Sequence, residues 1–183
     1  MTPSPTLPPT SLPASIASER PFLNLSAYRF VALHDTHTLR ERLFEQAQKA
    51  SLKGTVLLAE EGINLFVAGA PAAARAWLEA LCADARFANL DVKQSWSDAI
   101  PHRHLRVKVK REIIRMNQPQ VVPAAGRAPA VDAATLARWL DAGRCDDGRA
   151  IVLLDTRNAF EVDAGAFEGA LDWRLSRFSD FPA

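Results

Sequence analysis

The 183-residue sequence predicts an α+β N-terminal domain of the ferredoxin-like (split βαβ) type, followed by the beginning of an α/β domain. Three observations support this prediction. The apolar patterning over residues 22–115 runs in the order strand, helix, hairpin, helix, strand, with one further strand. Residues 116–131 hold prolines with hardly any periodicity, which is typical of a linker. The apolar run at residues 151–154 then indicates a strand that is buried on both faces.

The first domain should begin with a strand over residues 22–33 and continue with an amphipathic helix over residues 38–52. Thr38 and Glu41 have the spacing of a capping box, which predicts that the helix starts at this point. Gly54 is typical of a helix C-terminus, because glycine readily adopts the left-handed conformation that ends many helices.

A β-hairpin and a second helix follow. Residues 55–60 are a short apolar strand, Glu61–Gly62 is the expected turn, and apolar residues alternate over residues 63–67 in the returning strand. Pro71 suits the first position of the second helix. The last strands are expected over residues 91–97 and 105–114. We expect an antiparallel sheet with both helices on one face.

Composition limits the classes of function. The chain has 22 Lys and Arg against 21 Asp and Glu, so that its formal net charge is +1 and any basic surface must be local. Cys82 and Cys145 do not form a disulfide framework, and no metal-ligand spacing surrounds either one. No metal or organic cofactor motif is evident, and no apolar run approaches the length of a membrane span. A reduced cytoplasmic setting is the natural expectation.

The N-terminal segment, residues 1–21, is rich in Pro, Ser and Thr and holds only two charged residues, Glu19 and Arg20. Such a segment has too little apolar surface to offset the entropy of ordering, which predicts a disordered tail. It has neither the basic start and apolar stretch of a signal peptide nor the arginines of a transit peptide.

The last strand of the first domain alternates apolar residues strictly with cations. Period two predicts that Arg106, Lys108 and Lys110 face away from the core, with Arg103 and Arg111 close by. One interpretation is a stripe that contacts the phosphates of RNA. The other is a solvated strand face whose lysines prevent edge pairing. No obvious pair of aromatic residues accompanies the cations in the sequence, which argues against RRM-like stacking of bases.

Asp155 and Arg157 come directly after the apolar run of the second domain. Open α/β sheets bind their ligands at the carboxyl ends of their strands, so these side chains are candidate site residues. Glu161 follows, and Gly165 and Gly169 then punctuate a loop. The alternative is an ion pair that only fixes the loop.

The pattern Asp155-x-Arg157, Glu161, Gly165 and Gly169-Ala170 resembles the first signature of rhodanese-homology domains. A ferredoxin-like domain joined to such a domain through a proline-bearing linker resembles the oxygen-dependent tRNA uridine hydroxylases, which act on the wobble uridine. The other matching segments are residues 58–64, 107–114 and 173–182.

This resemblance implies that residues 132–183 are an incomplete rhodanese-homology domain. It implies tRNA as the partner, molecular oxygen as a co-substrate and the cytoplasm as the location. Asp155, Arg157 and Glu161 would line the rim of the active site. The first domain, residues 22–115, would help to hold the tRNA, with the five cations of the last strand as candidate contacts.

One departure from the family matters. Rhodanese chemistry uses a cysteine in a loop after a later strand, and no such loop exists in this sequence. We therefore expect a truncated chain with no catalytic residue of its own, inactive as a hydroxylase. Two further functions stay open: a rhodanese-type sulfurtransferase, and a non-catalytic RNA-binding or protein-binding module.

Overall fold

The structure is a computed structural model that describes residues 20–118, 120–121, 126 and 128–181. The chain divides after Ile114 into two compact units, and each is described by itself. Apart from Arg20 and Pro21, the tail predicted over residues 1–21 lies outside the described residues, as does part of the predicted linker.

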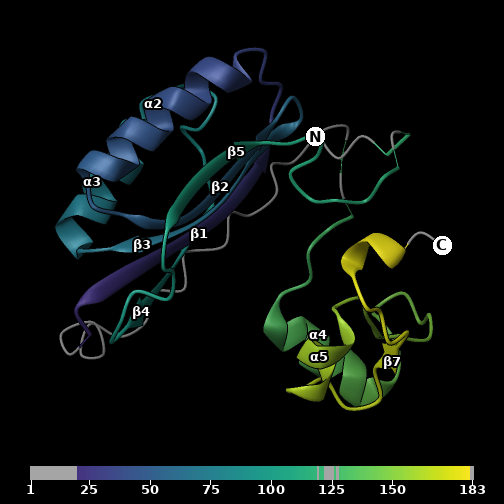
Figure 1. The fold of residues 1–183 in the computed structure, drawn as a ribbon. Coiled ribbons are helices and arrows are strands. Elements are labelled where there is room, and N and C mark those ends of the chain that lie inside the picture. Colours follow the sequence, from purple (N-terminus) through teal and green to yellow (C-terminus); the bar gives the residue numbers. More distant parts are fainter. Residues whose placement is uncertain (1–19, 119, 122–125, 127, 182–183) are drawn as a thin grey trace. The chain divides into compact units, whose positions relative to one another are not determined.

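The first unit is a five-stranded sheet with two helices on one of its faces (Figure 1). Its strand order is β4-β1-β3-β2-β5. The strands are β1 (Phe22–Phe30), β2 (Lys53–Ala59), β3 (Gly62–Gly69), β4 (Val92–Ser97) and β5 (Leu105–Val109), and the helices are α2 (Thr36–Lys49) and α3 (Pro71–Cys82). The ferredoxin-like prediction for this region is confirmed. The expectation of a purely antiparallel sheet is wrong, because β5 pairs with β2 in parallel.

The predicted bounds of the first helix are also wrong. α2 begins two residues before Thr38, and the amide of Leu39 already donates to the carbonyl of Asp35, 2.9 Å away. Thr38 therefore lies inside the helix and cannot be its cap. Gly54 lies in β2, at a φ of 135°. A Cβ atom there would lie 2.1 Å from the carbonyl oxygen of Phe66, so the glycine permits the close approach of β2 and β3.

One pairing register sets both faces of the sheet. Leu25 in β1 opposes Val67 in β3, and Val67 opposes Gly54 in β2. Because successive strand residues point to opposite faces, alternate positions all face the helices. The buried core on that side includes leucines, isoleucine and valines of β1, β2 and β3, packed against leucines of α2 and Trp77 of α3. The intervening positions form the face that the helices leave open.

The second unit contains two short parallel strands and two helices, α4 (Ala133–Ala142) and α5 (Ala159–Asp163). β6 (Leu154–Asp155) and β7 (Leu171–Asp172) pair in register. Asp132 caps α4 and accepts a hydrogen bond from the amide of Thr135, 2.9 Å away. The prediction of a strand buried on both faces is wrong, because only two residues are paired and Val152 is 73% exposed.

An arginine ties the two helices of the first unit together. Arg86, just after α3, forms an ion pair with Asp35 at the start of α2, with Nη1 and Oδ1 2.5 Å apart. Its Nη2 lies 2.7 Å from Oδ2 of Asp84, which also accepts from Arg42. Hydrogen bonds from Arg86 hold the pKa of Asp84 and that of Asp35 below their ordinary values.

We predict that Arg86→Ala lowers the free energy of unfolding of the first unit by about 1 to 2 kcal/mol at neutral pH, because it removes charge-assisted hydrogen bonds. The two carboxyl groups have lowered pKa values in the folded state. Their stabilisation is therefore present above the ordinary carboxyl pKa of about 4 and is lost as the pH falls towards the lowered values. Denaturant unfolding at several pH values measures this.

The difference in the free energy of unfolding between the wild type and Arg86→Ala should become smaller as the pH is lowered. Arg75→Ala is the control, since its guanidinium donates only an exposed hydrogen bond to Gln94, 3.4 Å long. A pH-independent difference, or an equal loss in the control, would contradict the assignment.

Candidate functional site

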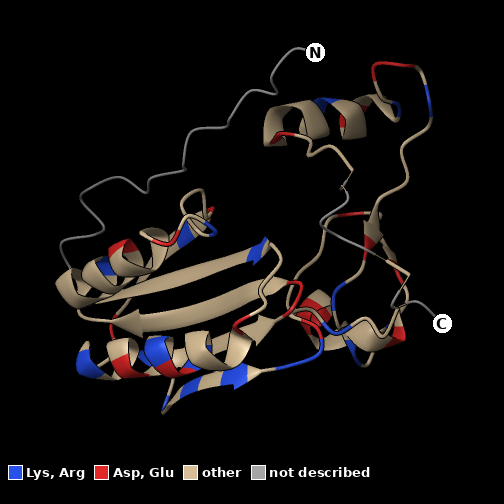
Figure 2. Ribbon diagram, turned by 90° about the horizontal axis from the view of Figure 1, so that it is seen from above, with Lys and Arg blue, Asp and Glu red and all other residues tan. Residues whose placement is uncertain are grey.

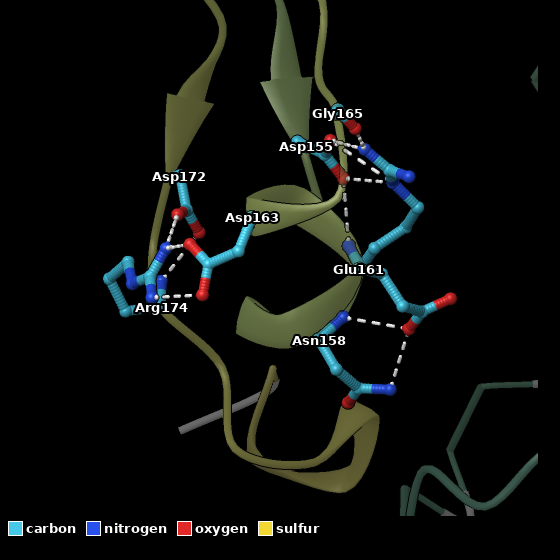
Figure 3. A network of polar contacts seen from close by, with 8 residues as sticks. Asp155, Asn158, Glu161, Asp163, Gly165, Asp172 and Arg174 are labelled. Carbon is cyan, nitrogen blue, oxygen red and sulfur yellow. Dashed lines mark hydrogen bonds and ion pairs between the residues drawn. The ribbon is translucent and has the colours of Figure 1, made fainter.

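Asp155 and Arg157 form a clasp at the end of β6 (Figure 3). Nη2 of Arg157 lies 2.5 Å from Oδ2 of Asp155, and its Nε lies 2.9 Å from Oδ1. The backbone amide of Arg157 also donates to Oδ1 of Asp155, over 3.0 Å. The same Nη2 donates to the carbonyl of Gly165, 2.7 Å away, so the pair anchors the far side of the loop.

The clasp lies in the wall of a cavity of about 630 Å³. The cavity is open to solvent and is lined by residues at β6, by the clasp and by the glycine-containing loop after α5, with Phe167 and Ala170 on the loop side. The complete lining is Leu153, Leu154, Asp155, Thr156, Arg157, Gly165, Ala166, Phe167 and Ala170. The sequence thus led to two side chains that share one cavity.

The electrostatics of the clasp favour the ionised state of both groups. The hydrogen bond from the Arg157 side chain, followed by that from its backbone amide, lowers the pKa of Asp155. The Asp155 carboxylate in turn raises the pKa of Arg157. A group held ionised in this way can orient a substrate or stabilise charge, but it is poorly suited to exchange protons near neutral pH.

Glu161 makes its hydrogen bonds at the start of α5. It is not among the residues that line the cavity. Its Oε2 accepts hydrogen bonds from the backbone amide of Asn158, 3.2 Å away, and from Nδ2 of the same residue, 2.8 Å away (Figure 3). Glu161 therefore caps the N-terminus of α5 and fixes the turn that follows the clasp.

A second clasp lies beside the first and was missed by the sequence reasoning. Asp172 and Arg174 repeat the spacing of the first pair at the end of β7 (Figure 3). The amide of Arg174 donates to Oδ1 of Asp172 over 2.7 Å, and its Nη1 also pairs with Asp163 of α5 at 2.6 Å. The signal was available as the repeat Leu-Asp-x-Arg, whose leucine and aspartate pair in register across β6 and β7.

The predicted basic stripe lies along the edge of the sheet in the first unit (Figure 2). All five predicted cations are exposed: Arg103, Arg106, Lys108, Lys110 and Arg111. Val107, which lies between Arg106 and Lys108, is buried. The alternation predicted for β5 is confirmed. In the part of the chain that the structure describes, none of these five cations is in an ion pair.

Neither cysteine lies at the cavity. Cys82 ends α3 in the first unit, where burial raises the pKa of its thiol, and Cys145 lies in the loop after α4. Among the described residues, no three His, Cys, Asp or Glu side chains are grouped closely enough to hold a metal ion. The described helices are also too short or too polar to cross a bilayer.

Comparison with known families now identifies the first unit. Residues 22–113 match the family model described as the UPF0176 acylphosphatase-like domain, which is half of the chain. The chain belongs to this family.

The matching curated proteins are longer than this chain. It is 61% identical over 160 residues to a tRNA uridine(34) hydroxylase of Variovorax paradoxus (strain S110), covering 87% of this chain and 61% of that protein. A tRNA uridine(34) hydroxylase of Bordetella avium (strain 197N) is 60% identical over 160 residues, covering 87% of this chain and 66% of that protein. An acylphosphatase from Bacillus subtilis is 18% identical over 48% of this chain and 96% of that one, with a TM-score of 0.36, too low to relate the two.

We predict that Asp155→Ala loosens the loop that lines one side of the cavity, since the carboxylate holds both the amide and the guanidinium of Arg157. Backbone amide hydrogen exchange between Arg157 and Gly165 should become faster. Asp147→Ala is a matched control, because Asp147 and Arg149 have the same spacing and pair at 3.0 Å. Unchanged exchange in Asp155→Ala, or equal acceleration in the control, would contradict the role of the clasp.

Proposed function

We propose that this chain acts in tRNA modification, as part of an enzyme that hydroxylates the wobble uridine with molecular oxygen. The observation that carries the proposal is the 61% identity to a protein named tRNA uridine(34) hydroxylase. That match extends over 160 residues, whereas the first unit ends at Ile114. The similarity therefore includes residues of both units, and this extent supports the same activity.

We infer a division of labour between the two units. The first unit, the ferredoxin-like domain of residues 22–115, holds the tRNA through the exposed cations of β5 and its flanks. Residues 116–131 connect it to the second domain, residues 132–183. An RNA backbone is attracted to clustered Lys and Arg side chains that have no acidic partners, and this attraction does not require a large net charge on the whole protein. The substrate tRNA suits a cytoplasmic protein.

For the second unit we propose the front part of a rhodanese-like domain. Two observations support this: its strands β6 and β7 are parallel, and the polar residues that follow β6 line a cavity. Asp155 and Arg157 act there by position and charge, orienting the groups that react. Glu161 supports them from outside the cavity by capping α5.

The chain of 183 residues is predicted to give no hydroxylated uridine by itself, because neither of its two cysteines lines the cavity. A protein extended to the length of the curated relatives should give the product with oxygen present. Mass spectrometry of nucleosides from treated tRNA measures both. In the extended protein, Arg157→Gln should lower turnover by roughly ten-fold or more, since it removes the guanidinium and leaves the Asp155 carboxylate without its cationic partner.

Turnover by the 183-residue chain alone would defeat the first part of this prediction. If the extended protein forms thiocyanate from thiosulfate and does not hydroxylate tRNA, it is a sulfurtransferase and the proposed hydroxylase activity is wrong.

The basic stripe gives a separate prediction. Replacing Arg106, Lys108 and Lys110 by Gln should weaken tRNA binding and reduce the slope of log affinity against log salt, by roughly 1 for each phosphate that the variant no longer neutralises. The control removes three exposed cations elsewhere, Lys49, Arg75 and Arg144, with the same change in net charge. The affinity of each variant for tRNA, measured over a range of salt concentrations, tests this prediction. Equal slopes for both variants would leave the stripe without a specific role.

A further inference from the structure

The face of the sheet opposite the helices carries a row of side chains that spans all five strands. The pairing register places Lys93, Ser26, Phe66, Thr55 and Arg106 side by side, in this order from β4 to β5. Both ends of the row are exposed cations, and Phe66 at its centre is 38% exposed. Between the aromatic ring and each cation lies a hydroxyl side chain.

A second, parallel row runs beside the first. It contains Tyr28, Asn64, Leu57 and Lys108, from β1 to β5. Tyr28 is 48% exposed, and its ring meets that of Phe30 edge-on, with the ring centroids 6.1 Å apart. The row again ends in an exposed cation at the β5 edge.

The two exposed aromatic residues are diagonal neighbours on the two adjacent strands β1 and β3. Phe66 opposes Ser26, and Tyr28 lies two residues further along the same strand. Diagonal positions of this kind lie about 7 to 8 Å apart. His102 packs edge-on against Phe66, with centroids 4.9 Å apart, and so supports the ring from one side.

The strand residues on this face carry charge of one sign only. Lys53, Lys93, Arg106 and Lys108 occupy positions that point away from the helices, and none of the described strands places an Asp or Glu there. These four cations therefore lie on the open face without a carboxylate from the strands to neutralise them.

The segment after β5 is tied to the second row of this face and to the hairpin turn that joins β2 and β3. Asn64 donates to the carbonyl of Ile113, 3.2 Å away. The backbone amide of Ile113 donates to the carboxylate of Glu61 in the hairpin turn, over 2.6 Å. Asn24 and Ala68 are buried at the opposite margin. The exposed part of the face is thus bounded on both sides.

We propose that this face binds unpaired nucleotides of RNA, with bases stacked on Tyr28 and Phe66 and phosphates beside Lys93, Arg106 and Lys108. Every base has a π-face, so exposed aromatic rings bind single strands without requiring one sequence. Phosphates favour the cations of this face, among which the strands place no Asp or Glu. Stacking requires bases that are not engaged in a helix, which selects a loop over a duplex. The inference rests on the proposed function and specifies how tRNA would be held.

The test uses the 183-residue chain and a fluorescein-labelled octauridylate as the probe. Tyr28→Ala and Phe66→Ala should each weaken binding roughly ten-fold, as expected for the loss of one stacked base. The salt slope should stay unchanged in both variants, since no cation is removed. Tyr28→Phe should retain the wild-type affinity, because it keeps the ring.

Phe160→Ala is the matched control, since Phe160 is an exposed aromatic residue in α5 and lies outside the cavity lining. Unfolding measurements on every variant separate a loss of contact from a loss of fold. Unchanged binding by folded Tyr28→Ala and Phe66→Ala would overturn the stacking face, as would equal affinity for an RNA duplex of the same length. A failure of the extended protein to hydroxylate tRNA, with octauridylate binding intact, would count against the proposed function alone.

Discussion

The pairing register of the five-stranded sheet is the constraint on which the rest of the first unit depends. Because side chains alternate along a strand, a slip of one residue would move the core leucines to the open face and the cations into the core. The approach of Gly54 to the carbonyl of Phe66 reinforces this register, since any other residue there would clash with the backbone of β3. The same pairing that buries Leu25 and Val67 exposes Phe66 and Arg106.

The sequence predicted the patterns that are local. Alternation identified the hairpin and the basic strand, and a proline marked the start of α3. Two sequence predictions were wrong: the start of the first helix and the orientation of the last strand. Thr38 carries a capping signal, yet the helix already begins at Thr36. The parallel orientation of β5 and β2 could not be predicted from the alternation of side chains, because period two is the same in both orientations. β2 also lies some fifty residues earlier in the chain.

The candidate sites show the same limit. Asp155 and Arg157 are close in sequence, so their pairing and their position beside a strand end could be expected. The aromatic residues of the open face could not, because Tyr28 and Phe66 are far apart in the sequence and only the pairing of β1 with β3 brings them together. The sequence offers no adjacent aromatic pair, but this absence does not exclude base stacking on the folded sheet.

The most direct test of this account is photo-cross-linking of tRNA that carries 4-thiouridine in its anticodon loop, followed by mass spectrometry of the cross-linked peptides. We predict cross-links to peptides of β1 and β3 that contain Tyr28 and Phe66. Cross-links confined to α2 and α3, on the opposite face of the sheet, would contradict it.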